Sequence, residues 1–231
     1  MRTSFTRGGI IAESEANATR LFGTAHSYYS TEGSSQCIRA MLFLALQGAP
    51  QNGKRPVLLA ARNAHKALLY AAALLDFDIR WLWPSAQAEG ALCSCPVTAE
   101  ALTGALHAMA QQDNTPFGVY VTSRIIWRVQ DILALAAVCR AQDVPLLVDN
   151  AHGPTCAFCR KTATPSHRRG HVLRLCPQDP AGGHRRCVSA SGATMPLCRT
   201  KRLCGGRWRC SALPALLPHL QSLDACNAVL E

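Results

Sequence analysis

The chain contains no run of about 18 consecutive apolar residues, so its sequence predicts no membrane-spanning helix. Its N-terminal stretch also lacks an apolar core before a cleavage site, and we therefore expect no signal peptide and a cytoplasmic location. In that compartment the 12 cysteines are expected to remain thiols. Aromatic residues make up only 6% of the chain and charged residues 16%, but 48% is hydrophobic, which is typical of a globular protein with a core.

Acidic residues are almost absent from the last third of the chain. Between residues 155 and 210 the only acid is Asp179, whereas 12 of the chain's 24 basic residues and seven of its 12 cysteines fall there. The net charge of +10 therefore belongs mainly to this segment. A basic surface of this kind suggests an anionic partner such as nucleic acid.

The first two thirds of the chain alternate between helical and strand patterns. Helices are predicted at residues 12–23, 36–48, 65–76, 98–111 and 131–142. Short apolar strands are predicted at residues 25–30, 56–61, 78–84, 117–123 and 144–149. Continuous apolar strands separated by helices predict an α/β fold, with a mostly parallel sheet covered by helices on both faces.

Polar segments follow the predicted strands. Ligands of such sheets bind at the carboxyl ends of the strands, which places the segments TEGSS, RNAH, VTS and VDNAHG at one edge. Gly33, Ser34 and Ser35 precede or open a helix, so their backbone N–H groups and the helix dipole would suit a phosphate. A Gly-Ser turn before a helix is, however, more often only a cap.

Three titratable residues belong to the same predicted edge. Asp149 ends an apolar strand and either caps the next loop or pairs with a protonated ring nitrogen. His65 and His152 each follow a strand. A single histidine is more often structural, but two histidines facing one crevice with an aspartate favour a functional site.

Four blocks of the sequence resemble the major domain of the bacterial Orn/Lys/Arg decarboxylases, a branch of the fold-type I pyridoxal-phosphate enzymes. They are STEGSSQCIRAMLFLAL, ARNAHKALL, LCSCPVT and LLVDNAHG, and the likeness covers residues 9–154 with matching order. It implies a basic amino-acid substrate, a homo-oligomeric parent, and neither a membrane nor a nucleic acid as partner. It also implies an incomplete fold-type I large domain.

The resemblance implies a role for each residue of the predicted edge. Gly33, Ser34 and Ser35 would hold the phosphate of pyridoxal 5′-phosphate. His65 would stack on the pyridine ring, and Asp149 would pair with the ring nitrogen. His152 would lie near the reacting carbon as the catalytic residue, and the resemblance implies no metal. The protonated ring would act as an electron sink when the substrate's carboxylate leaves.

The chain departs from the family pattern at the residue the chemistry needs most. Such enzymes require a lysine that forms a Schiff base with the cofactor, carried in a block like DSAHKTLP. The chain has four lysines, and none lies in such a block: Lys54, Lys66, Lys161 and Lys201. A Pro-Gly-His-Lys segment and the family's C-terminal small domain are also missing. We therefore expect a fragment without decarboxylase activity.

The missing block reappears when codons are shifted. Read one base late, the codons of residues 172–191 permit Cys-Cys-Asp-Ser-Ala-His-Lys-Thr-Leu-Pro-Val-Val-Thr-Gly-Gly-Ala-Tyr-Leu-His-Leu. The lysine lies across the codons of Gln178 and Asp179. One base further, residues 208–216 permit Ala-Leu-Phe-Gly-Ser-Thr-Ser-Pro-Ser, another family-like block. A smaller shift is possible at residues 124–127, whose codons, read one base early, permit the family-like Pro-Asp-Tyr-Leu. The written frame would instead place a buried Arg124 near the cofactor.

These shifts divide the chain into three parts. Residues 1–154 form a partial decarboxylase major domain, residues 155–219 are an out-of-frame segment, and residues 220–231 are a short in-frame remnant. The middle part has no helical or strand period and many arginines, as a GC-rich gene gives in a wrong frame. We expect it to be irregular and poorly ordered, because an unselected segment has no core pattern.

A second interpretation of the basic segment is a zinc-binding module. Cys156 and Cys159, followed by His167 and His171, have a spacing that resembles that of zinc ligands. The surrounding arginines of residues 156–210 would then contact nucleic acid. The gap between the two pairs is short for a zinc finger, and no hydrophobic framework surrounds them.

Overall fold

The computed structural model describes residues 9–21, 26–30, 34–49, 53–84, 95–125, 128–150, 172–175 and 186–191. The helices are α1 (Ile10–Leu21), α2 (Ser34–Leu46), α3 (Ala67–Leu75), α4 (Ala99–Gln111) and α5 (Ile132–Ala141). The strands of the main sheet are β1 (His26–Ser30), β2 (Val57–Ala61), β3 (Asp78–Leu82), β4 (Gly118–Thr122), β7 (Leu146–Asp149), β8 (Val172–Leu175) and β9 (Arg186–Ser191). Two shorter strands, β5 (Arg124–Ile125) and β6 (Arg128–Val129), form a separate antiparallel pair.

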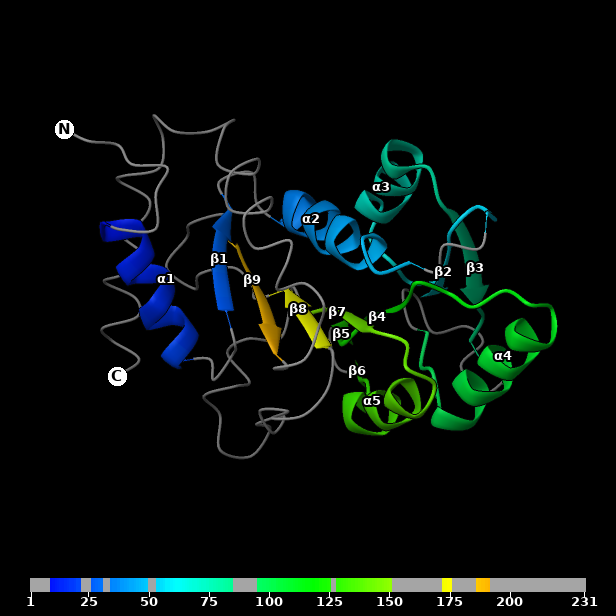
Figure 1. The fold of residues 1–231 in the computed structure, drawn as a ribbon. Helices are drawn as coiled ribbons and strands as arrows, with labels where there is room; N and C mark the ends of the chain where they lie inside the picture. The colour runs from blue at the N-terminus through cyan, green and yellow to red at the C-terminus, as the bar shows by residue number, and fades with distance from the viewer. Residues whose placement is uncertain are drawn as a thin grey trace.

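The main sheet has seven strands in the order β1-β9-β8-β7-β4-β2-β3 (Figure 1). Strands β8, β7, β4, β2 and β3 are mutually parallel. Strand β9 is antiparallel to β8, and β1 is antiparallel to β9, so β1 runs in the same direction as the parallel set. The predicted α/β fold with a mostly parallel sheet is confirmed.

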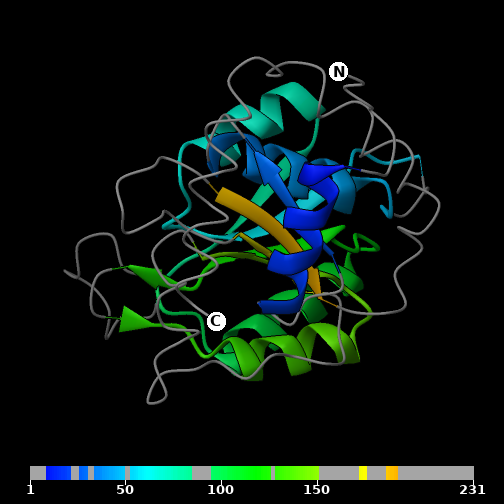
Figure 2. The ribbon, with the colours of Figure 1, turned by 90° about the vertical axis from the view of Figure 1, so that its left-hand side faces the viewer.

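Helices cover both faces of this sheet. Helices α2 and α3 lie on one face and α4 and α5 on the other, as the two perpendicular views show (Figures 1 and 2). Every residue of β2, β4 and β7 is buried, which explains why these strands are continuously apolar where they cross the core.

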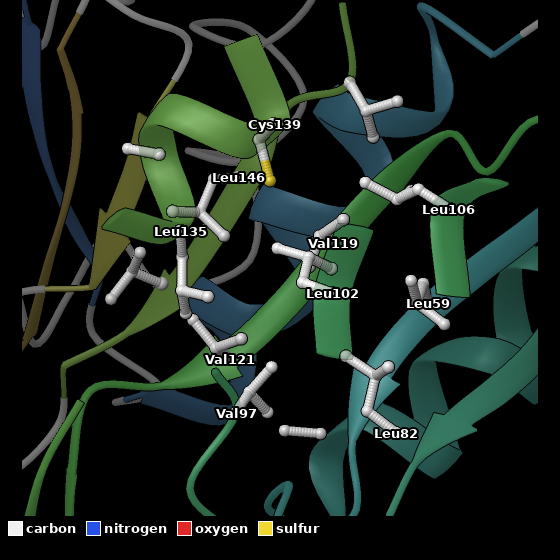
Figure 3. Close-up of a cluster of buried hydrophobic side chains, with 14 of the residues drawn as sticks. Leu59, Leu82, Val97, Leu102, Leu106, Val119, Val121, Leu135, Cys139 and Leu146 are labelled. Carbon is white, nitrogen blue, oxygen red and sulfur yellow. The ribbon is translucent and has the colours of Figure 1, made fainter. Parts of the chain in front are cut away.

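The alternation of side chains along each strand divides the core into two layers. Val119, Val121 and Leu146 pack with α4 and α5 in the cluster drawn in Figure 3. Tyr120 and Leu147 point the other way and pack with α2 and α3. This alternation decides which side of the sheet receives the polar residues at the strand ends.

Helix α4 begins where the sequence predicts. The Oγ1 atom of Thr98 accepts a hydrogen bond from the backbone N–H of Ala101 at 3.2 Å, which satisfies one of the donors that a helix N-terminus leaves without a partner. Glu100 lies in the first turn, where a negative charge complements the helix dipole.

Replacing this cap should weaken the fold measurably. We expect Thr98→Ala to lower the free energy of unfolding by about 1 kcal/mol, because the N–H of Ala101 loses its acceptor. Urea unfolding followed by circular dichroism measures the change. Thr98→Ser keeps the hydroxyl and should unfold near the wild-type midpoint. Equal midpoints for the alanine and serine variants would contradict a capping role.

Four strands of the structure are not predicted by the sequence pattern. The pair β5–β6 flanks residues 126–127, and the burial of the Arg124 side chain lies outside what the structure describes. Strands β8 and β9 are the only parts of residues 155–219 that the structure describes. They lack a strand period of their own, and each pairs with a neighbour that is distant in sequence, β8 with β7 and β9 with β1.

Two findings concern the described helices and cysteines. Within the described ranges, no helix is long and apolar enough to cross a membrane. The three cysteines described, Cys37, Cys95 and Cys139, are buried thiols. Burial raises the pKa of the Cys139 thiol to about 12, so this thiol is protonated and unreactive at neutral pH.

Candidate active site at the carboxyl edge of the sheet

The structure brings several of the predicted site residues to one edge of the sheet. Strands β1, β2, β4 and β7 run in the same direction, so the segments that follow them lie at the same edge. These segments contain Ser34 and Ser35 after β1, His65 after β2, and Asp149 at the end of β7. Gly33 and His152 lie outside the described residues.

Asp149 is the buried acid of this edge, with 3% of its surface exposed. It follows Leu147 by two residues along β7, and strand alternation therefore places it on the side of α2 and α3. The hydroxyl of Tyr120 donates a hydrogen bond to its Oδ2 atom at 2.8 Å. Its backbone carbonyl accepts from the N–H of Ser123 at 2.9 Å, which joins the ends of β4 and β7.

Tyr120 is a neutral hydrogen-bond donor. It lies in the middle of β4 with none of its surface exposed. Burial raises the pKa of Tyr120 well above its ordinary value, and the charge of Asp149 and the hydrogen bond to it act in the same direction. The phenol therefore stays protonated over the whole physiological pH range, and its O–H donates a hydrogen bond to the Asp149 carboxylate.

The start of α2 provides a site suited to an anion. Ser34 and Ser35 are the first two residues of the helix, and Ser34 is buried with 7% of its surface exposed. Helix α2 packs on β1, β7, β8 and β9, and β7 is the strand that carries Asp149. Its N-terminal backbone N–H groups and its dipole favour a negatively charged group.

His65 lies just before α3 and is exposed to solvent. Its Nδ1 atom accepts a hydrogen bond from the backbone N–H of Ala67 at 3.2 Å. This contact fixes the ring at the start of α3 and requires that Nδ1 carries no proton. His65 thus has a structural contact of its own, and its stacking on a cofactor ring stays a prediction.

Two buried polar atoms at this edge have no hydrogen-bond partner among the described residues. They are the Oγ1 atom of Thr122 and the Oδ1 atom of Asn63. Thr122 pairs in register with Asp149 on the neighbouring strand, and it points to the same side of the sheet as Tyr120. Buried polar atoms are normally satisfied, and a bound polar ligand is one partner that would satisfy these two.

This set of groups fits pyridoxal 5′-phosphate. The cofactor carries a phosphate, a ring nitrogen and further polar substituents, and the edge offers a helix N-terminus, a buried carboxylate and two unsatisfied polar atoms. The chemistry of each group at the edge complements one on the cofactor.

The sequence pattern alone does not identify Tyr120, Thr122 or Asn63 as part of the site. The signal that could have identified two of them is a pair of hydroxyl groups in an otherwise apolar strand, on Tyr120 and, two residues later, on Thr122. An aromatic residue in a buried strand is, however, the ordinary composition of a core, and only the pairing of β4 with β7 connects Tyr120 to Asp149.

The alternative zinc site falls outside the part of the chain that the structure describes. Cys156, Cys159, His167 and His171 all belong to undescribed segments. Within the described ranges, no group of three or more histidine, cysteine or acidic side chains could hold a metal ion.

Sequence comparison connects this arrangement to a family. The profile of the family described as "Orn/Lys/Arg decarboxylase, major domain" matches residues 4–171, which includes the whole described edge and continues past Pro154. The arginine decarboxylase of Halalkalibacterium halodurans is 27% identical over 146 residues, which cover 63% of this chain and 28% of the relative. That of Bacillus subtilis is 24% identical over 145 residues, with the same shares of the two chains.

Solved structures of low sequence identity share the fold. The constitutive lysine decarboxylase of E. coli superimposes with a TM-score of 0.73 at 19% identity, covering 98% of this chain and 32% of that one. Mouse CSAD gives a TM-score of 0.63 at 18% identity, covering 80% of this chain and 42% of that one. Oryza sativa TDC, solved with PLP and tryptamine, gives 0.63 at 16% identity, covering 78% and 41%. This chain thus spans less than half of each protein it resembles.

Proposed function

Because the chain belongs to the Orn/Lys/Arg decarboxylase major-domain family, we propose that residues 1–154 are part of the cofactor-holding domain of a pyridoxal-phosphate-dependent decarboxylase of basic amino acids. The observation that carries the proposal is the position of Asp149, a buried carboxylate at the carboxyl end of β7 on the side of α2. The substrate of the intact parent would be ornithine, lysine or arginine. Its expected location is the cytoplasm and its expected assembly a homo-oligomer.

Each residue of the edge has a distinct role in this proposal. When bound, pyridoxal phosphate supplies an electron sink for the pair that remains when the substrate's carboxylate leaves. Asp149 would hold a proton at the ring nitrogen, and the N-terminus of α2, with Gly33, Ser34 and Ser35, would bind the phosphate. His65 would lie against one face of the ring. His152 would act near the reacting carbon.

We propose that this chain is inactive because it lacks the lysine that would bind the cofactor covalently. In the shifted frame that lysine follows the last residue of β8 by three to four positions, across the codons of Gln178 and Asp179. Strand β8 is parallel to β7, so a residue that follows β8 would be at the same edge as Asp149. This coincidence of frame and topology supports the proposal that residues 155–219 are out of frame and that residues 220–231 return to it.

The shifted frame also suits β9. Its six residues would read Gly-Ala-Tyr-Leu-His-Leu, which has a tyrosine and two leucines where the written Arg-Cys-Val-Ser-Ala-Ser has one valine. The sheet position between β8 and β1 would then be taken by a strand with more apolar surface to bury. No described residue favours the zinc-binding alternative.

Noncovalent cofactor binding tests the proposed site in the chain as it exists. Pyridoxamine 5′-phosphate has the ring and phosphate but no aldehyde, so it forms no adducts with surface lysines. We expect saturable binding by the full chain in a fluorescence titration, weakened about tenfold or more in Asp149→Asn, because a charge-assisted hydrogen bond is lost. The exposed Asp143 offers a matched control, Asp143→Asn, which should bind like the wild type. Absence of saturable binding, or equal binding by the Asp149→Asn variant, would contradict the proposed site.

A further inference from the structure

We propose that Tyr120 is a positioning residue that holds the Asp149 carboxylate in place for the cofactor's ring nitrogen. This inference rests on the proposed function and extends it to a residue in the middle of a core strand. It starts from one contact, the hydrogen bond of 2.8 Å from the Tyr120 hydroxyl to Oδ2 of Asp149.

The geometry of the two strands makes this contact directional. In the β4–β7 register Tyr120 lies opposite Leu147, and Thr122 lies opposite Asp149. The Tyr120 side chain therefore reaches diagonally, by two residues, toward the carboxyl end of the neighbouring strand. It meets Asp149 from the core side, so it limits rotation of the carboxylate at the edge.

The packing around Tyr120 makes the contact rigid. Its ring is fully buried in the layer that also contains Leu58, Leu68 and Leu147. A ring held by packing on all sides cannot change rotamer without disturbing the core. The hydroxyl is therefore presented at a fixed point, as a group that orients a functional carboxylate must be.

The Tyr120 hydroxyl compensates the buried Asp149 side chain for its separation from water. Removing a carboxylate from water is unfavourable unless hydrogen-bond donors compensate. The neutral phenol is such a donor, and its proton is retained because burial and the neighbouring charge oppose ionisation. A carboxylate held beside a ring nitrogen favours its protonated form. Without the Tyr120 hydroxyl the Asp149 carboxylate can rotate away from that nitrogen, so the bound ring nitrogen should become easier to deprotonate.

The test uses the full chain, pyridoxamine 5′-phosphate labelled with ¹⁵N in the ring, and the substitution Tyr120→Phe. This substitution keeps the ring and removes only the hydroxyl. Compared with the wild type, we expect binding to be weakened about three- to tenfold and the pKa of the bound ring nitrogen, measured by ¹⁵N NMR, to fall by about half a unit to one unit. Tyr70→Phe removes a hydroxyl from an exposed position on α3 and should change neither quantity.

A second replacement guards against a variant that does not fold. Substitution of Tyr120 by 3-fluorotyrosine keeps both the ring and the hydroxyl that contacts Asp149, so binding and the ring-nitrogen pKa should stay near their wild-type values. Circular dichroism and urea unfolding of every variant separate loss of fold from loss of positioning.

The outcomes distinguish this inference from the proposed function. If Asp149→Asn weakens binding while Tyr120→Phe leaves the ring-nitrogen pKa unchanged, Tyr120 is only a core residue and the inference is overturned, but the proposed function stands. If Tyr120→Phe alters only the free energy of unfolding, the inference is likewise overturned. If the wild-type chain does not bind pyridoxamine 5′-phosphate, the proposed function fails and this inference fails with it.

Discussion

Expression of the gene with the reading frame repaired, so that the lysine block of residues 172–191 returns, should yield a protein that traps pyridoxal phosphate on one lysine after borohydride reduction, whereas the present chain traps none at a unique site. The trapped lysine should be the one encoded across Gln178 and Asp179. The reason is geometric, since the reacting amine must be held within about 3 Å of the cofactor's aldehyde carbon. Mass spectrometry of tryptic peptides locates the modified residue.

The lysines of the described residues do not provide this amine. Lys54 is exposed, and its Nζ atom pairs with Asp113 at 2.8 Å. Lys54 precedes β2, so it lies at the end of the strand opposite to the site. Lys66 is the N-cap residue of α3. We therefore expect no release of carbon dioxide from ornithine, lysine or arginine by this chain.

Two controls make the frame prediction decisive. Sequencing of the gene should show codons for Ser-Ala-His-Lys-Thr one base off the frame, from Leu175 through Asp179 and into Pro180. In the restored protein, replacing the new lysine with alanine should abolish trapping. Release of carbon dioxide by the unrestored chain, above that of cofactor in buffer, would show that the chain is active without this lysine and would contradict the proposal.

The substitution Leu147→Ala should destabilise the fold by about 3 kcal/mol, within the range of about 2 to 5 kcal/mol found for buried leucines. Leu147 is fully buried on β7, the central strand of the sheet. Its side chain lies in the layer between the sheet and helices α2 and α3. A Cβ atom at Gly118 would lie only 3.1 Å from its Cδ1 atom, which shows how closely β4 approaches it. The alanine variant would leave a cavity that a tightly packed layer fills poorly.

Urea unfolding at neutral pH measures this loss, and an exposed leucine gives the matched control. Leu74 lies on α3 with 67% of its surface exposed, so Leu74→Ala should change the free energy of unfolding by less than about 0.5 kcal/mol. If the two variants unfold at the same urea concentration, the layer between the sheet and α2–α3 is not the core that the structure shows.

The elements predicted correctly from the sequence are those whose pattern is local. Helices α2 to α5 show apolar spacing on one face, and strands β2, β4 and β7 are short apolar runs between turn residues. The Thr98 cap is readable because the residue and its partner are three positions apart. Helix α1 begins two residues before its prediction, within the usual variation of helix ends.

Two of the four strands missed by the sequence depend on pairing at long range. Strands β8 and β9 have no period of their own, and their places are set by hydrogen bonds to β7 and β1. The same reason explains the outcome for the candidate site. Asp149 is identifiable because an acid ends an apolar strand, but Tyr120 is not, because its hydrogen-bond partner lies 29 residues further along the chain on a neighbouring strand.

The position of β9 makes the start of the chain depend on its end. Among the described strands, β1 pairs with β9 alone, with His26 opposite Ala190 and Ser30 opposite Arg186. During synthesis β1 must wait, with an unpaired edge, until residues from the last fifth of the chain leave the ribosome, and such long-range pairing is slow. An unpaired edge recruits other strands. A change of reading frame late in the gene can therefore cause aggregation through a strand encoded near its beginning.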